Sequence, residues 1–274
     1  MKIVTWNVNS IRIRTQRLLA WLAANAPDVV CLQETKTEDE GFPFAALRDA
    51  GYDAVTYGQK SYNGVAILAR TASGLTLNDV TRGFGDDVPD DEARVIAATV
   101  GGIRIVDLYV PNGSDLTSDR YPYKLEWYRR LRRFLEKTSS ASAELVVLGD
   151  MNVTADDADV WSPDAWRGKI HCSEPEREAL AHLREFGLVD IFRRLTPAGG
   201  VWSWWDYRGV AFFKDQGLRI DHVLVTESVA QRATACTIDR DPLLMVIHIG
   251  ILAAITALGA IAAFRTFEDR LVKG

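Results

Sequence analysis

The chain has 274 residues, of which 47% are hydrophobic and 25% charged, with only 9 Pro and 20 Gly. This composition excludes a disordered, collagen-like or low-complexity protein, and the length is near the upper limit for a single hydrophobic core. The net charge of −5 argues against a polycationic coat for nucleic acid, although a local basic patch could still bind it. Cys31, Cys172 and Cys236 are too few and too scattered for a disulfide framework or a Cys-rich zinc site. With no signal peptide expected at the N-terminus, we predict a reducing, cytoplasmic location.

Hydrophobic periodicity predicts a strand over residues 2–8, a helix over 11–24 and a strand over 28–34. Further along, Gly101-Gly102 joins two strands as a hairpin, which adds an antiparallel component. Because no repeat or long linker interrupts the pattern, these elements should share one layered core. The other predicted elements are strands over 64–70, 94–99, 103–110, 144–148, 201–205 and 219–225, and helices over 123–137 and 174–186.

Four polar clusters lie next to predicted strands, at residues 6–9, 33–36, 149–152 and 219–222. Rigid strand ends can direct polar groups into a shared cleft. The clusters offer carboxylate and amide oxygens without the Cys or His pairs of a zinc site, so they suit Mg²⁺, with Mn²⁺ as a substitute. Each cluster alone could be a turn, but four in one chain favour a site.

Six motifs follow one another between residue 6 and residue 221. They are WNVNSIR at 6–12, LQETK at 32–36, YVPNG at 109–113, LGDMN at 148–152, WSWWDYR at 202–208 and LRID at 218–221. In this order they are similar to the motifs of the exonuclease III group of apurinic/apyrimidinic endonucleases. The resemblance implies an α/β fold, the four-layered α/β/β/α sandwich of the endonuclease/exonuclease/phosphatase type. It also implies metal-dependent hydrolysis of DNA phosphodiesters, 5′ to abasic sites and 3′ to 5′ from duplex ends.

Phosphodiester hydrolysis needs a deprotonated water, relief of charge on the phosphoryl oxygens and help for the leaving 3′-oxygen. We assign Glu34 as a metal ligand, with Asn7 supplying a neutral oxygen. Asp150 is the candidate base and Asn152 should orient the phosphate or the water, and both are also candidate metal ligands. If the strand continues past Asp150, the two side chains point to the same face.

Tyr109 would offer its phenol to the phosphate or to the leaving oxygen. The resemblance assigns Asp221 to the metal and catalytic network. Taken singly, Glu34 could be a surface carboxylate, Tyr109 a half-buried aromatic residue and Asp221 a partner of Arg219. His222, which alternation sends to the opposite face from Asp221, is interpreted as structural.

DNA contacts are expected from the 202–208 segment, which the resemblance places in the minor groove near the missing base. Asn112 and Ser114 form a turn able to bind a phosphate, and Arg94 is a further candidate clamp. The basic run in residues 120–133 favours a solvated helix face over a DNA surface. The expected partner is duplex DNA bound by a monomer, and the named DNA-binding candidates are Arg94, Asn112, Ser114, Trp202, Tyr207 and Arg208.

The family pattern breaks after Pro242. There the family carries a Ser-Asp-His segment, whose Asp-His pair supplies a catalytic histidine and its orienting carboxylate, whereas this chain continues into an apolar run. His248 has no neighbouring Asp and is not expected to replace that histidine. Loss of a group that stabilises the transition state typically costs ~100- to 1000-fold in rate, so we expect weakened turnover.

Residues 243–264 contain no charged residue and are long enough for a membrane-spanning helix. The sequence therefore predicts a catalytic domain over 1–242 and an atypical tail over 243–274. A membrane tether, a read-through or frame change in the source sequence, and a soluble element packed on the sheet all remain open for this tail. Two alternative functions stay beside the nuclease: a membrane-associated phosphatase or phospholipase of the same fold, and a non-catalytic DNA-binding remnant.

Overall fold

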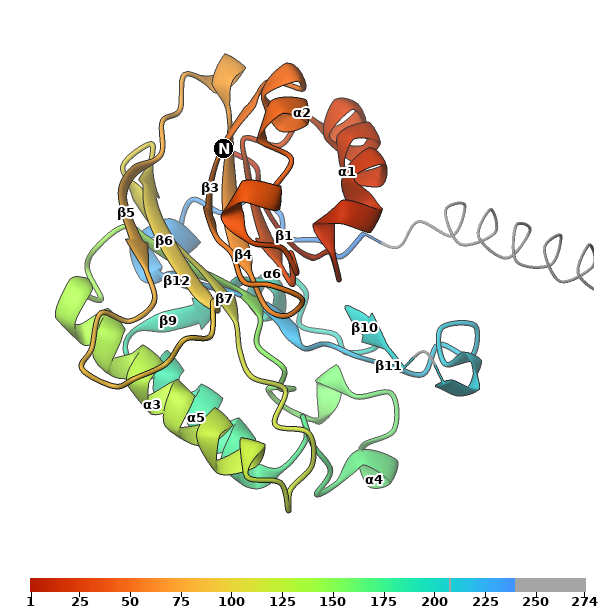
Figure 1. Ribbon diagram of the computed structural model, residues 1–274. Coiled ribbons are helices and arrows are strands. Elements are labelled where there is room, and N and C mark those ends of the chain that lie inside the picture. The colour runs from red at the N-terminus through yellow and green to blue at the C-terminus, as the bar shows by residue number, and fades with distance from the viewer. Residues whose placement is uncertain (207, 240–274) are drawn as a thin grey trace, which may run out of the picture. The chain divides into compact units, whose positions relative to one another are not determined.

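The computed structural model, which describes residues 1–206 and 208–239, contains two large β-sheets that pack face to face (Figure 1). The first sheet has the strand order β1-β2-β4-β3, with β1 at Ile3–Asn7, β2 at Val29–Gln33, β3 at Tyr52–Tyr57 and β4 at Val65–Arg70. The second has the order β5-β6-β7-β8-β12-β9, with β5 at Asn78–Arg82, β6 at Val95–Val100, β7 at Ile103–Tyr109, β8 at Leu145–Asp150, β9 at Leu188–Asp190 and β12 at Asp221–Thr226.

Helices cover the outer face of each sheet. Helices α1 (Ile11–Asn25) and α2 (Phe44–Asp49) lie outside the first sheet, while α3 (Arg120–Thr138) and α5 (Glu174–Arg184) lie side by side outside the second (Figure 1). Three apolar clusters fill the spaces between the four layers, one between the sheets and one beneath each helix pair. The predicted α/β/β/α sandwich is therefore confirmed, and Met1–Cys236 form one compact unit.

The long, strongly apolar elements match their predicted bounds closely, whereas short or polar ones were missed. Strand β5 lies at the edge of its sheet and consists mainly of polar and charged residues, so it carries little hydrophobic signal. The strand predicted over 201–205 is reduced to β10 at Trp204–Trp205, which pairs with β11 at Gly217–Leu218. The remaining short helices are α4 (Pro163–Trp166), α6 (Ile191–Leu195) and α7 (Glu227–Ala230), with 3-10 turns at Asp39–Gly41, Thr71–Ser73, Asp157–Asp159 and Arg208–Val210.

The strand directions bring the polar clusters to one end of the sandwich. Strands β1 and β2 are parallel, as are β7 and β8, so their carboxyl ends lie together in each sheet. Strand β12 runs antiparallel to β8, and its first residue, Asp221, is therefore the register partner of Asp150, the last residue of β8. Between the sheets, Gln33 Nε2 donates a 2.6 Å hydrogen bond to Asp107 Oδ1 and ties β2 to β7.

Gly149 precedes Asp150 for a steric reason. Its φ is 139°, and a Cβ atom at this position would lie 2.0 Å from the carbonyl oxygen of Leu108 on the neighbouring strand. Only glycine permits this close approach of β7 and β8. In the LGDMN motif, Gly149 thus allows β7 and β8 to pack closely, and this packing places the carboxylate of Asp150.

A buried ionic network fixes the start of β12. The Arg219 guanidinium, with no exposed surface, donates to Asp159 through two bonds of 2.7 and 2.8 Å and to Asp190 at 2.7 Å. His222 lies in the same network and its Nε2 contacts the carbonyl oxygen of Val153 at 2.8 Å, in keeping with the structural role predicted for it. Arg219 is thus paired with two carboxylates other than Asp221.

Within residues 1–206 and 208–239, no helix is both long enough and apolar enough to cross a membrane. The predicted span at 243–264 lies outside the described residues.

Replacing Arg219 by Met should destabilise the protein strongly, because buried Asp190 would lose its guanidinium partner and buried Asp159 would keep only the partly exposed Arg193. We expect a loss of about 3–5 kcal/mol in the free energy of unfolding, measured by urea denaturation. Arg194→Met is the matched control, since Arg194 pairs with Glu227 on the surface and its loss should barely move the midpoint. Equal midpoint shifts for the two variants would contradict this account of the network.

Candidate active site

One amide nitrogen lies at the centre of the site. Asn7 Nδ2 donates to Glu34 Oε1 at 2.8 Å and to Asp150 Oδ2 at 2.9 Å, so two carboxylates from different sheets meet at one atom. The amide oxygen of Asn7 accepts from the backbone N–H of Asn9 at 3.0 Å. In this orientation Asn7 bridges the carboxylates, whereas the predicted role as an oxygen ligand would require its amide to turn.

Glu34 is held in a strained backbone conformation directly after β2. Its φ of 52° is rare for a residue with a side chain and turns the carboxylate away from the strand direction. Lys36 Nζ lies 2.7 Å from Glu34 Oε2. Burial alone would raise the pKa of Glu34, but hydrogen bonds from Asn7 and Lys36 outweigh it and bring that pKa below its usual value. Glu34 is therefore ionised at neutral pH.

Tyr109, the last residue of β7, directs its hydroxyl to the same place. The hydroxyl forms a hydrogen bond with Glu34, and burial together with the charges of Glu34 and Asp150 raises the pKa of the phenol. Tyr109 therefore stays protonated and can act as a donor. Arg94 lies over its ring at 4.6 Å and also pairs with Glu92. Because Arg94 is only 6% exposed, the structure argues against its predicted role as a DNA clamp and gives it a supporting position behind Tyr109.

Asp150 and Asp221 face each other as register partners across β8 and β12. Burial and the neighbouring charges of Asp221 and Glu34 raise the pKa of Asp150 well above that of a free carboxyl. Burial likewise raises the pKa of Asp221 to about 6, although a hydrogen bond with Ser203 opposes this. Both carboxyls thus hold protons more strongly than carboxyls in water.

Asn152 reaches the site by a route that differs from the predicted one. Strand β8 ends at Asp150, and Asn152 has a left-handed φ of 51°, so strand alternation does not place it. Its backbone N–H donates to Asp150 Oδ1 at 3.0 Å, and its side-chain oxygen accepts from Asn112 Nδ2 at 3.2 Å. Asn112 in turn accepts from the backbone N–H of Ser114 at 3.1 Å, the predicted turn. The YVPNG and LGDMN motifs therefore meet through two asparagine side chains.

Sequence reasoning missed the buried pair beneath these asparagines, Lys124 and Glu176. Lys124 belongs to the basic run yet has no exposed surface, and its ammonium contacts Glu176. One signal could have found it, since Lys124 precedes buried Trp127, Tyr128 and Leu131 at the spacing of one helix face. A lysine on the apolar face of a helix needs a buried partner.

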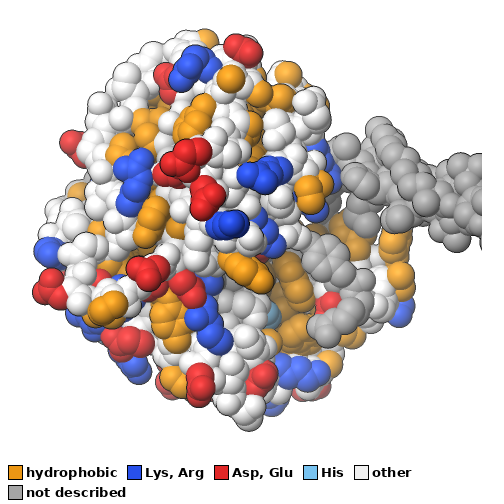
Figure 2. Space-filling view, in the orientation of Figure 1, with side chains coloured by type: hydrophobic (Ala, Val, Ile, Leu, Met, Phe, Trp, Pro, Cys, Tyr) orange, Lys and Arg blue, Asp and Glu red, His pale blue; other side chains and the backbone are white. Residues whose placement is uncertain are grey.

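The other arginines of the basic run also pair with carboxylates of the protein. Arg130 is buried and pairs with Asp86 and Asp90, and Arg120 pairs with Glu92. Positive and negative side chains are intermixed over the face drawn in Figure 2, without a broad area of one sign. The basic run was predicted to form a solvated helix face. This prediction was only partly right, because Lys124 and Arg130 are buried. The other paired members are Arg129 and Arg133, both with Glu126, and Arg132 with Glu136.

The WSWWDYR segment divides between core and surface. Trp202 is only 6% exposed and its Nε1 donates to the carbonyl oxygen of Asp215 at 3.1 Å, which argues against the predicted contact with DNA. Trp204 packs edge-on against Trp166 and near His171. Tyr207 and the side chain of Arg208 lie outside what the structure describes.

The donor set fits a hard divalent cation. Glu34 and Asp150 offer carboxylate oxygens around a single nitrogen, with Asp221 adjacent to Asp150. Among the described residues, no three His, Cys, Asp or Glu side chains form a cluster that could hold a metal alone. Mg²⁺ does not require one, because it is commonly bound by one or two carboxylates together with water and substrate phosphate.

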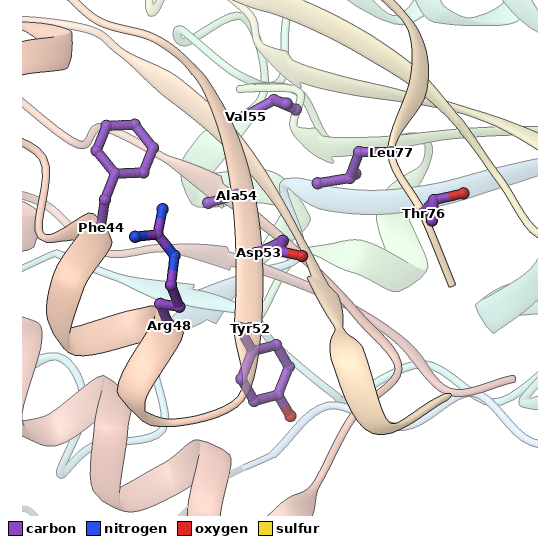
Figure 3. Close-up of a pocket in the computed structure, with 8 residues that line it drawn as sticks. All are labelled: Phe44, Arg48, Tyr52, Asp53, Ala54, Val55, Thr76 and Leu77. Carbon is purple, nitrogen blue, oxygen red and sulfur yellow. The ribbon is translucent and has the colours of Figure 1, made fainter. Parts of the chain in front are cut away.

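A separate pocket of about 270 Å³ lies on the first sheet beside α2 (Figure 3). Its charged side chains are Arg48 and Asp53, and none of the predicted site residues lines it. It therefore lacks the gathered carboxylates that metal-assisted hydrolysis needs. The lining residues are Phe44, Arg48, Tyr52, Asp53, Ala54, Val55, Thr76 and Leu77.

Comparison with known proteins gives consistent matches over most of the chain. Residues 4–253 match the model of the Endonuclease/Exonuclease/phosphatase family. Exodeoxyribonuclease III of Haemophilus influenzae is 35% identical over 244 residues, which cover 85% of this chain and 90% of that protein. An AP endonuclease from Archaeoglobus fulgidus has 38% identity and a TM-score of 0.84, with 89% and 93% of the two chains covered. A 3′ phosphatase from Neisseria, bound to a product DNA hairpin, has 43% identity and a TM-score of 0.80, with 84% and 88% covered.

Replacing Asp221 by Asn should stabilise the metal-free protein at neutral pH. The folded-state pKa of about 6 exceeds the unfolded value of about 3.9, so the native protein binds extra protons between these values and loses stability as pH rises through that window. We expect a gain of about 3 kcal/mol at pH 7.5, and almost none at pH 4, in urea unfolding with chelator present. Asp164→Asn, at an exposed carboxylate, is the control. Destabilisation by Asp221→Asn at pH 7.5 would refute this prediction.

Proposed function

Because the chain belongs to the Endonuclease/Exonuclease/phosphatase family, as its motifs predicted, we propose that it is a DNA repair nuclease of the exodeoxyribonuclease III type. In this proposal it hydrolyses DNA phosphodiesters 5′ to abasic sites and from 3′ ends of duplexes. The observation that carries the proposal is the meeting of Glu34 and Asp150 at Asn7 Nδ2, beside the Tyr109 hydroxyl. This arrangement supplies acid, base and donor groups for phosphoryl chemistry at one place.

Asp150 is the proposed base. A carboxyl with a raised pKa accepts a proton from water more readily than an ordinary carboxylate, and burial and neighbouring charges raise the pKa of Asp150. The backbone N–H of Asn152 holds one oxygen of Asp150 and Asn7 holds the other. The carboxylate is thus fixed in orientation before substrate binds.

Tyr109 is the proposed donor to the phosphate or to the leaving 3′-oxygen. Its raised pKa keeps the proton on the phenol at neutral pH, and Arg94 packs against the ring and fixes its position. Asn152 presents an amide proton that could bind a phosphoryl oxygen, while Asn112 donates to the Asn152 side-chain oxygen and holds it in place. Asp221, next to Asp150, completes the proposed set.

Membership of this family supports a divalent-metal cofactor, and we propose that the ion here is Mg²⁺, replaceable by Mn²⁺. Glu34, Asp150 and Asp221 would hold it, with Asn7 and Asn152 as amide neighbours. When bound, the ion would relieve negative charge on the phosphate and lower the pKa of water.

We propose duplex DNA with an abasic site as the substrate, bound by a monomer through Asn112, Ser114 and the 204–208 segment. We further propose that residues 1–242 form the catalytic domain, separate from the tail at 243–274, and that the protein acts in the cytoplasm. If the 243–264 segment is a membrane span, the same domain would be tethered to a membrane.

The uncharged segment at 243–264 favours one second candidate, a phosphatase that acts on phosphorylated lipid head groups. Such an enzyme would release phosphate from lipid vesicles and leave an abasic duplex intact. The exonuclease III-like motifs, spread over residues 6–221, support the nuclease instead.

The direct test is incision of a duplex that carries one abasic site, under single-turnover conditions. Wild-type protein should cut with Mg²⁺ and stop with excess chelator. Tyr109→Phe removes the donor and should lower the rate by about 100-fold. Tyr62→Phe, at a residue 70% exposed, should match the wild type. Persistent incision in chelator, or full activity of Tyr109→Phe, would exclude this mechanism.

A second test concerns the absent Ser-Asp-His segment. Replacing the residues after Pro242 by a family-type segment that contains Ser-Asp-His should raise the incision rate by about 100- to 1000-fold, because it restores a group that stabilises transition-state charge. The control graft carries Ala in place of that His. Equal rates for the two grafts would show that the missing His does not limit the reaction.

A further inference from the structure

The buried ammonium of Lys124 has all three of its protons in use. Its Nζ donates to the carbonyl oxygen of Asn152 at 2.6 Å, to the carbonyl oxygen of Asn112 at 3.1 Å, and to Glu176 Oε1. An ammonium has three donors and no acceptor, so this set saturates it. Two of the three partners belong to the asparagines whose side chains meet at the site.

Glu176 is fixed just as completely. Its Oε1 also accepts from the backbone N–H of His171 at 3.1 Å, and its Oε2 accepts from the hydroxyl of Ser173 at 2.6 Å. Oε2 accepts in addition from the backbone N–H of Ser173 at 3.2 Å, a bond of the capping box at the N-terminus of α5. Lys124 is therefore anchored to the start of one helix while it projects from another, α3.

His171 completes the support from the other side. Burial lowers its pKa to about 4, so the ring is neutral at physiological pH. Its Nδ1 lies 2.6 Å from the carbonyl oxygen of Asn152, and its Nε2 lies 3.4 Å from Asn112 Nδ2. One tautomer satisfies both contacts, with Nδ1 donating and Nε2 accepting.

From this geometry we infer that Lys124 and Glu176 are positioning residues that set the Asn152 side chain, together with the Asn112 side chain that donates to it, for phosphate binding. Asn152 Nδ2 donates one proton to the carbonyl oxygen of Val110 at 2.8 Å and keeps the other for a phosphoryl oxygen. The inference deepens the proposed function and rests on it. Asn152 has a left-handed backbone and lies outside the strand, so the sheet alone does not fix its carbonyl. The ammonium fixes that carbonyl and the one of Asn112 at once, and thereby sets the distance between the two amide groups.

A double-mutant cycle separates this role from a general loss of stability. Lys124→Met should lower the single-turnover incision rate of the full chain by about 100-fold, the scale expected for a misplaced catalytic group, with DNA affinity changed far less. In an Asn152→Ala background the same substitution should cost less than about 3-fold, because the group it positions is already gone. An equal cost in both backgrounds would overturn the inference.

Arg130→Met is the matched control, since Arg130 is also buried on α3 but pairs with Asp86 and Asp90. Its effect should be small and the same in both backgrounds. If Lys124→Met does not fold, Glu176→Gln keeps the shape of the pair and removes one charge, and it should show a smaller loss that again disappears with Asn152→Ala. A Glu176→Gln loss that persists in that background would also overturn the inference.

Side-chain amide NMR signals give a readout that does not depend on activity. The Asn112 and Asn152 signals should be separate and slow to exchange in the wild type and in Arg130→Met, and should move to the positions of free asparagine in Lys124→Met. Unchanged signals would refute the positioning role. Absence of any wild-type incision would instead refute the proposed function, while the NMR comparison would still decide the role of Lys124.

Discussion

The site depends on a bridge between two sheets that share no strand. Asn7 ends a strand of the first sheet, yet its amide nitrogen donates to Asp150 of the second as well as to Glu34 of its own. Behind it, the hydrogen bond from Gln33 to Asp107 joins the same sheets inside the core. Because hydrogen bonds demand short distances and defined angles, two such bonds fix the register of one sheet on the other. These two bonds thereby also fix the distance between the carboxylates of the proposed site.

The Asn7 bridge also brings several carboxylates together in a buried environment. Glu34, Asp150 and Asp221 gather at one end of the sandwich, and the nearby cations are committed elsewhere, with Arg219 held by Asp159 and Asp190. Lys36 pairs with Glu34. The raised pKa of Asp150 and of Asp221 records the electrostatic cost of this arrangement. A bound cation would relieve this repulsion. The arrangement of carboxylates that destabilises the metal-free protein is therefore the one that would favour metal binding in the proposed reaction.

The fold and the centre of the site could be predicted from sequence because both depend on local patterns. Short apolar runs located the main strands, several of which, such as β2 and β8, are buried on both faces. Polar residues at the ends of those runs located Asn7, Glu34, Tyr109 and Asp150. The order of the motifs supplied the topology. The short edge strand β5 was not predicted, because it has few apolar residues and is stabilised by pairing with β6.

Partner choice among charged residues could not be predicted in the same way. Arg94 and Trp202 stand in positions that suggest DNA contact, yet both are buried, Arg94 against Tyr109 and Trp202 beside Asp215. Lys124 meets Glu176 at a separation of 52 residues, and Arg219 meets Asp159 at 60. Such pairs depend on how whole elements pack, and a single sequence contains no local signal for that beyond the position of a cation on an apolar face.

Helix α3 illustrates the consequence for function. Its charges suggest a surface that holds the DNA backbone, but Arg130 ties down the loop at 86–90 and Lys124 supports two asparagine carbonyls. A cation saturated by protein acceptors has no donors left for phosphate, and moving it into contact with DNA would leave buried carboxylates unpaired. In the proposed function, Lys124 and Arg130 therefore act indirectly. They hold rigid the parts of the protein that surround the proposed phosphate-binding groups.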